Sequence, residues 1–145
     1  QYELQDFSKE WTKKYLDLAG IKDGNIIKTI ISNSKGHPFY LYLSAKTYNE
    51  ICNQDKTPTV NDFGRNPKEI IRRFIYNLGD EEVNILKYLA VSNSFTYEIF
   101  TYILSKFHIA CDPERFKHII SYSFIHTLAD NKFYIHSLMR NGLKE

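Results

Sequence analysis

Two clusters of side chains could do chemistry, but an ordinary structural explanation is available for each. Three consecutive carboxylic acids begin at Asp80, and paired carboxylates can act as a general acid and base. The first turn of a helix also favours acids, because its dipole stabilises negative charge, and we prefer this explanation. His108, Cys111 and His118 lie within eleven residues, whereas a zinc site needs four ligands in closely spaced pairs. We therefore expect no catalytic residue and no metal ligand in either cluster.

The sequence also lacks the signature motifs of common enzymes. It contains no GxxxxGKS/T phosphate loop, no GxGxxG, no GxSxG and no HExxH. We therefore expect that the chain is not an enzyme by itself.

The composition indicates a soluble globular chain, with 145 residues of which 43% are hydrophobic and 25% charged. No apolar run approaches the roughly 20 residues of a membrane helix, so we expect no membrane partner. Cys52 and Cys111 are far apart, which is typical of unpaired thiols in the reducing cytoplasm. The first residue is not methionine, and Lys, Ile and Asn are abundant. We expect a piece of a longer, bacterial polypeptide.

Residues 1–53 have the apolar spacing of three helices, which predicts a helical subdomain. The first helix follows a Ser8 cap, the second spans 25–35, and the third begins at Pro38. Residues 54–66 are rich in Asn, Asp, Thr, Pro and Gly, which predicts a linker. The residues that we expect on the inward faces of these helices are Trp11, Tyr15, Leu18, Ala19, Ile26, Ile27, Ile30, Ile31, Phe39, Tyr42, Leu43 and Tyr48.

Residues 67–145 begin with four helical patterns, of which the first and last have a cap followed by proline. The period then changes to two over residues 124–135, which predicts a β-hairpin around the turn at 129–132. A short helix is expected from Ser137. Helices followed by a hairpin are the order of a winged helix-turn-helix domain. The predicted fold is therefore mainly α, with a helical lid subdomain followed by a winged-helix domain.

A winged helix raises the alternative of a DNA-binding domain of a transcriptional regulator. In such folds the helix before the hairpin enters the major groove. Arg115, Lys117 and His118 on that helix and Lys132 in the wing would then contact bases or phosphates. A groove reader needs several clustered cations, and the net charge of the chain is only +2. Nucleic acid is therefore the less favoured partner.

Two stretches resemble a known family when they are taken together. In "FSKEWTKKYLDLAGIKDGNIIKTIISNSKGHPFYLYLS", a helix ends in an apolar-Gly-Ile turn, and a second helix is followed by Gly-X-Pro-aromatic-X-Leu. This order resembles the helical lid of STAND-class P-loop NTPases, which include the NB-ARC and related AAA+-like signalling ATPases. The second half looks like the winged-helix domain that follows the lid, and "KFYIHSLMRNGL" resembles its MHD region.

The resemblance implies a nucleotide site that the chain shares with an upstream P-loop domain of the same polypeptide. Gly36 and Pro38 would pack against the adenine or ribose, and His136 would contact the β-phosphate of ADP. The parent would bind ADP or ATP with Mg²⁺, whereas no cofactor is expected for this chain alone. Two positions depart from the MHD motif, because Ile135 replaces its methionine and Ser137 its aspartate.

The same resemblance implies a regulatory role. The chain would sense bound ADP or ATP and couple it to conformational change and assembly, with self-association or a protein effector as the outcome. Two ordinary explanations remain open. Gly36 and Pro38 could have a purely structural role, in which they end one helix and begin the next. His136 could be a hydrogen-bonded histidine that closes the hairpin. The chain would then be a plain helical interaction domain.

Overall fold

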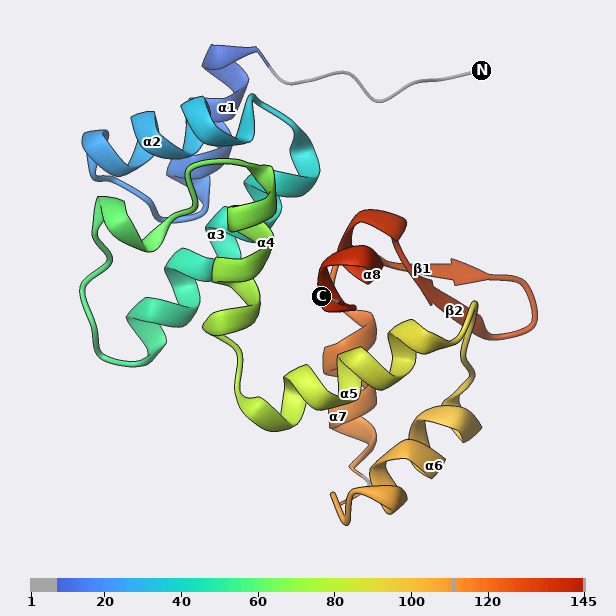
Figure 1. Cartoon of the computed structure of the whole chain (residues 1–145). Helices are drawn as coiled ribbons and strands as arrows, with labels where there is room; N and C mark the ends of the chain where they lie inside the picture. Colours follow the sequence, from blue (N-terminus) through green and yellow to red (C-terminus); the bar gives the residue numbers. More distant parts are fainter. Residues whose placement is uncertain (1–7, 111, 145) are drawn as a thin grey trace. The chain divides into compact units, whose positions relative to one another are not determined.

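A computed structural model describes residues 8–110 and 112–144 of the chain. These residues form a mainly helical protein with one small antiparallel hairpin, as the sequence predicts (Figure 1). The chain divides into two compact units, the first ending at Leu78 and the second beginning at Gly79. Among the described residues, no helix combines the length and the apolarity needed to cross a membrane.

The first unit contains four α-helices and one short 3-10 helix. A side-chain cap begins each of the four α-helices, and the predicted caps at Ser8 and Asn66 are confirmed. Pro38 is the first residue of its helix, as expected. One core cluster of this unit consists of Leu16, Ile21, Ile26, Ile30, Leu41 and Phe63. The elements are α1 (Lys9–Leu18), α2 (Gly24–Ser34), α3 (Pro38–Asn53), η1 (Val60–Asp62) and α4 (Pro67–Tyr76).

The buried face of α1 differs from the predicted one. Trp11 and Leu18 were expected inward, but they are 64% and 79% exposed. Thr12 and Leu16 are buried instead, with 1% and 0% exposure, and Tyr15 is half-buried. The packing of α1 against α2 and α3 selects the stripe through Leu16, and the Thr12 hydroxyl is satisfied by a bond to the Ser8 carbonyl. An aromatic ring therefore lies outside although its spacing fits a core position.

The segment predicted as an interdomain linker is packed into the first unit. Thr59 donates its backbone N–H to the Asp62 carboxylate, which closes the turn of η1. Phe63 is only 4% exposed, and Gly64 is buried. The next helix, α4, packs on α3, so the compact units divide after α4 and not before it. The polar composition of residues 54–66 marks a loop between packed helices.

The second unit contains three helices, the hairpin and a final short helix. The hairpin pairs Ile125 with Ile135 at its base and Leu128 with Lys132 next to the turn. Asp130 and Asn131 form the turn with φ of 62° and 57°, a region that Asn and Asp tolerate better than most residues. The elements are α5 (Asp80–Val91), α6 (Tyr97–Lys106), α7 (Pro113–Ile120), β1 (Ile125–Leu128), β2 (Lys132–Ile135) and α8 (Ser137–Leu143).

A third extended segment joins this hairpin, which the sequence did not predict. Phe95 lies between α5 and α6 and forms an antiparallel bridge with Phe133 of β2. Its N–H and C=O both bond to the Phe133 backbone at 2.8 Å. The bridge connects the start of the unit to its end, and it places the Phe95 ring in the core with 1% exposure.

Aromatic rings pack the interior of the second unit. Phe116 of α7 makes edge contacts with Phe100 and Phe133, at ring-centroid distances of 5.1 and 5.6 Å. Phe100, Ile103 and Leu104 of α6 are buried, whereas Ile99 is 39% exposed. The other buried residues of the unit are Ile85, Leu86, Leu89, Ala90, Ile119, Tyr122, Phe124, Ile125, Ile135, Met139 and Leu143.

Candidate functional site

The Gly-His-Pro sequence forms the tight junction between α2 and α3. Lys35 ends α2 in the left-handed region with φ of 56°, and Gly36 continues it with φ of 73°. Gly36 is buried, and its N–H donates to the Ser34 hydroxyl at 3.3 Å. A positive φ favours glycine, so the turn itself accounts for Gly36. Pro38 follows as the first residue of α3 and is half-buried.

His37 caps α3 through its side chain. Its Nδ1 accepts the backbone N–H of Phe39 at 3.2 Å, and the ring lies 5.0 Å from that of Tyr40. The residue is half-buried. This histidine therefore has a structural role that periodicity alone could not reveal.

His136 lies where β2 ends and α8 begins. Its N–H donates to the Phe124 carbonyl at 2.7 Å, and its Nδ1 accepts the Leu138 N–H at 3.2 Å. An Nδ1 that accepts a hydrogen bond carries no proton, so the neutral ring has its N–H at Nε2. The backbone of His136 thus closes the hairpin and its side chain caps α8, so the residue is hydrogen-bonded as one of the open explanations expects. The neutral ring also has a defined donor nitrogen.

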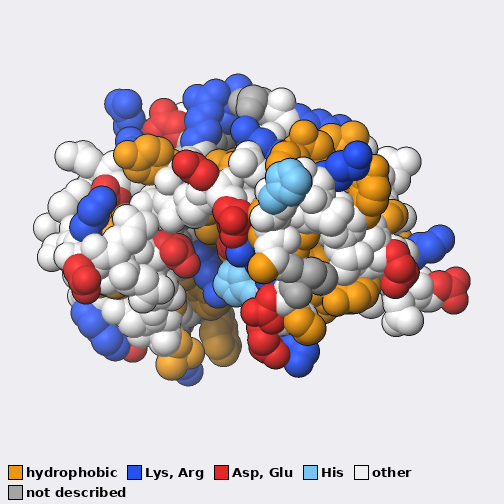
Figure 2. Space-filling model, turned by 90° about the horizontal axis from the view of Figure 1, so that it is seen from below, with side chains coloured by type: hydrophobic (Ala, Val, Ile, Leu, Met, Phe, Trp, Pro, Cys, Tyr) orange, Lys and Arg blue, Asp and Glu red, His pale blue; other side chains and the backbone are white. Residues whose placement is uncertain are grey.

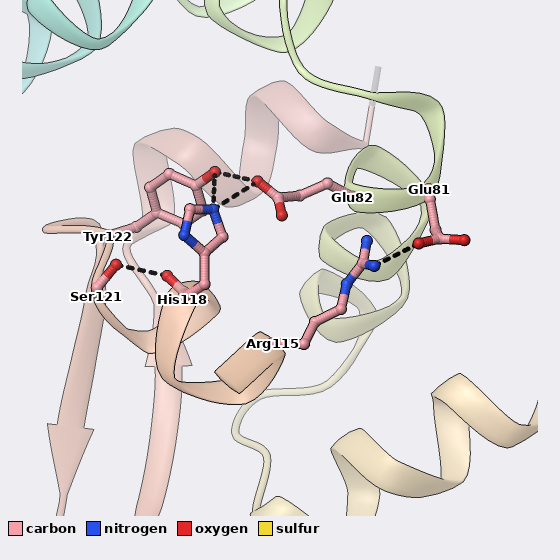
Figure 3. A network of polar contacts seen from close by, with 6 residues as sticks. All are labelled: Glu81, Glu82, Arg115, His118, Ser121 and Tyr122. Carbon is pink, nitrogen blue, oxygen red and sulfur yellow. Dashed lines mark hydrogen bonds and ion pairs between the residues drawn. The ribbon is translucent and has the colours of Figure 1, made fainter. Parts of the chain in front are cut away.

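Arg115 and His118 of α7 contact two of the acids that begin α5 (Figure 3). Arg115 forms an ion pair with Glu81, and its Nε is buried. His118 Nε2 lies 3.2 Å from Glu82 Oε2. Lys117 pairs with its own neighbour Glu114 at 3.4 Å. The three residues predicted to contact DNA on this helix therefore each face a carboxylate.

Glu82 is the centre of a network that clamps α7 to α5. The Tyr122 hydroxyl donates to Glu82 Oε2, the atom that also faces His118, and the phenol oxygen lies 3.3 Å from His118 Nε2. Tyr122 is 4% exposed. A carboxylate, an imidazole and a phenol can exchange protons, but here they hydrogen-bond to one another. The acids beginning at Asp80, expected only to favour a helix start, therefore also connect two helices.

The structure places the remaining candidates apart from this clamp. Lys132 is exposed at the start of β2. His108 is exposed, and Cys111 lies outside the described residues. Within residues 8–110 and 112–144, no group of three or more His, Cys, Asp or Glu side chains could hold a metal ion.

The surface shows a similar mixture of charges. On the face drawn in Figure 2, Asp and Glu side chains lie among the Lys and Arg side chains. Affinity for a nucleic-acid backbone depends on clustered cations that neutralise several phosphates. The local pairing on α7 disfavours a DNA interface on this helix.

Replacing Tyr122 by phenylalanine is expected to lower the free energy of unfolding by about 1.5–3 kcal/mol. The change removes a hydrogen bond to an ionised carboxylate and leaves Glu82 less well satisfied. Urea denaturation followed by circular dichroism measures the loss. Tyr102→Phe is the matched control, because Tyr102 is 60% exposed and its variant is expected to stay within about 0.5 kcal/mol of wild type. Equal stability of the two variants would contradict the clamp.

Comparisons of the chain with protein-family models, with curated proteins and with solved structures found no match. The function of the chain therefore has to be argued from its own residues and motifs.

Proposed function

We propose that the chain is the regulatory lid and winged-helix module of a STAND-type signalling ATPase. The first unit would be the lid and the second unit the winged helix. The observation that carries this proposal is the geometry of His136, whose Nδ1 is occupied by capping α8. Its Nε2–H is then the donor that a β-phosphate oxygen needs. The module would sense bound ADP or ATP and change its conformation and assembly state.

The element order of the second unit supports a winged helix. Helix α5 is followed by the extended residue Phe95, then by α6, α7 and the hairpin. Because Phe95 pairs with Phe133, the hairpin gains a third strand position from the segment between the first two helices. This pairing holds the hairpin against the helices. The position of the hairpin therefore depends on the packing of the whole unit.

The junction at Gly36 and Pro38 supports a lid contact. The buried glycine allows the backbone to turn sharply, and the following proline is half-buried at the start of α3. Proline has no N–H that needs a partner, so its ring can pack against an adenine or ribose. The geometry is that of a helix junction, and the nucleotide contact is part of the proposal.

The two departures from the MHD motif are compatible with this role. In the family an aspartate after the histidine orients the imidazole, and here that position is Ser137. The Leu138 backbone N–H already fixes the His136 ring by bonding to Nδ1. A backbone group would thus supply the orientation that the aspartate supplies elsewhere. The methionine position is Ile135, which is buried with 3% exposure.

The other parts of the machinery would belong to the parent polypeptide. A P-loop domain upstream would bind the phosphates and Mg²⁺ and position the γ-phosphate, which is where phosphoryl-transfer catalysis takes place. The residues described here would contribute donors and packing and no catalytic group. A cytoplasmic location, and self-association or an effector protein as partner, complete the proposal.

A duplex titration distinguishes this proposal from a DNA-binding domain. We expect no binding of double-stranded DNA even at about 50 mM salt, because Arg115, Lys117 and His118 are paired with acids. Fluorescence anisotropy of a labelled duplex, titrated with the chain, measures the binding. Binding that weakens steeply between about 50 and 200 mM salt, and that is lost in Lys117→Ala, would contradict this expectation and favour the alternative.

The rate of ADP release tests the role of His136 in the parent polypeptide. Loss of a hydrogen bond to a charged phosphate is expected to speed release at least about tenfold in His136→Ala. A fluorescent ADP chased by excess unlabelled ADP measures the rate. His136→Asn is a second variant, because asparagine is a good helix cap but does not reproduce the imidazole Nε2 donor. His126→Ala is the control, because it removes a neighbouring imidazole, with its ring centroid 5.7 Å from that of His136, and leaves His136 in place. Unchanged release from a folded His136→Ala protein would overturn the assignment.

A further inference from the structure

A cleft of about 460 Å³ lies within the first unit, and none of the Gly-His-Pro residues lines it. Helix α2 contributes Thr29 and Asn33, the segment around η1 contributes Val60 and Asn61, and α4 with the residues before it forms the third wall. The volume is in the usual range for small-molecule sites. Because α2 packs against both η1 and α4, these walls belong to one compact unit. The cleft is therefore formed before any ligand arrives.

Two arginines and one glutamate supply the charge of this cleft. Arg65, Glu69 and Arg73 all line it. Glu69 Oε1 accepts the Arg65 backbone N–H at 3.0 Å and lies 3.7 Å from the Arg65 Nε. That backbone hydrogen bond, followed by the charges of neighbouring arginines, lowers the pKa of Glu69, so the carboxylate is ionised at neutral pH. The cleft thus has one excess positive charge.

The two guanidinium groups differ in how firmly they are engaged. The Arg65 side chain is 89% exposed and only distantly paired with Glu69, so it can turn toward a ligand. Arg73 is exposed, and among the described residues no acidic side chain forms an ion pair with it. Guanidinium groups match the geometry of phosphate oxygens and bind them in a bidentate manner. Both arginines are thus available for an anion.

The remaining wall residues suit a molecule that is larger than a bare anion. Val60 is 41% exposed and offers an apolar surface, with the largely buried Phe63 behind it. Thr29 and Asn61 provide neutral hydrogen-bonding groups near the arginines. Because one excess charge cannot neutralise a phosphoryl group of about −1.5 to −2, such neutral donors are needed for its other oxygens.

We propose that this cleft binds a small phosphorylated molecule, with its phosphoryl group held by Arg65 and Arg73 and its organic part against Val60. The proposal is independent of the nucleotide contacts of Pro38 and His136. It assigns a ligand site to the first unit alone. A concave site of this volume fits a small phosphate monoester better than a nucleic-acid backbone, which needs an extended cationic track.

Nuclear magnetic resonance of the 17.1 kDa chain tests the site directly. Inorganic phosphate and phenyl phosphate are each titrated against sodium chloride of equal ionic strength. We expect saturable shifts of the Asn61, Gly64 and Arg65 amides, with phenyl phosphate bound several-fold more tightly because of its apolar ring. Shifts that chloride reproduces would overturn the proposal. Equal affinities for the two phosphates would overturn the proposed contact between the organic part of the ligand and Val60.

Three variants separate binding from folding. Arg73→Gln is expected to weaken phenyl phosphate binding about tenfold, which corresponds to losing a charged hydrogen bond. Glu69→Gln keeps an oxygen for the Arg65 N–H but removes the repelling charge, so it is expected to strengthen binding several-fold. Lys56→Gln, at an exposed position outside the cleft, is expected to leave binding unchanged. Wild-type affinity for phenyl phosphate in Arg73→Gln would overturn the proposal. A single-stranded oligonucleotide that binds more tightly than phenyl phosphate, and shifts amides beyond the cleft, would also overturn it.

Discussion

Gly64→Ala is expected to destabilise the first unit by about 3 kcal/mol or more. A Cβ at this position would overlap the backbone of Glu69 and Ile70 and lie 2.6 Å from the Glu69 Cβ. These atoms belong to the first turns of α4, which cannot move without disturbing its packing on α3. The Gly64 carbonyl also accepts a 2.8 Å hydrogen bond from the Asn33 side chain. A methyl group here therefore disturbs two helices at once.

Gly24→Ala is the matched control for this prediction. Gly24 is the first residue of α2, and nothing lies within 4 Å of a Cβ built there. Alanine is the better helix former, so we expect stability equal to wild type or slightly higher. Urea denaturation followed by circular dichroism compares the two variants. If Gly64→Ala unfolds at the same urea concentration as Gly24→Ala, the close packing of residues 63–66 against α4 is not as described.

Phe95→Ala is expected to lower the free energy of unfolding of the second unit by about 3–5 kcal/mol. The ring is 1% exposed and lies 5.8 Å from the ring of Phe133. Its removal leaves a cavity beside the small sheet and weakens the pairing of the Phe95 segment with β2. Hydrogen exchange of the Phe133 amide is expected to accelerate, because that N–H bonds to the Phe95 carbonyl.

Val91→Ala serves as the control in the same unit. Val91 is 73% exposed at the end of α5, so its truncation is expected to change stability by no more than about 0.5 kcal/mol. Thermal or urea unfolding with both variants side by side separates a core defect from a general loss of side-chain volume. A Phe95→Ala protein that keeps both wild-type stability and slow exchange at Phe133 would refute the bridging role.

The helix boundaries were predictable because local chemistry determines them. Asn66 and Asp112 accept the backbone N–H groups of the first turns that follow, and a proline comes next in each case. The hairpin was predictable for a similar reason, since residues 124–135 alternate around a polar turn. Caps, prolines and alternation act within a few residues, so a single sequence contains them.

The inward face of α1 and the division into units depend on distant contacts. Trp11 fits an amphipathic stripe, yet only the packing of α2 and α3 decides whether that stripe or the one through Leu16 is buried. The loop at 54–66 has the composition of a linker but packs through Phe63. Phe95 is a single bridging residue, too short for a period of two to show.

The candidate site shows the same limit. The position of His136 after the hairpin could be read from the sequence, but its role as the cap of α8 could not, because histidine is not a usual capping residue. The clamp joins Glu82 to His118 and Tyr122 across 36 and 40 residues of sequence. No local pattern connects such residues. Arg115 and His118 therefore looked available for DNA until their partners on α5 were known.

The nucleotide content of the natural polypeptide, purified without added nucleotide, tests whether the chain is part of a nucleotide-binding switch. The protein is denatured, and the released ADP and ATP are separated and quantified against protein concentration. We expect nearly one ADP per chain, retained through purification by the proposed lid and winged-helix module. A folded polypeptide that carries neither ADP nor ATP, and acquires neither on incubation with Mg²⁺, would contradict it.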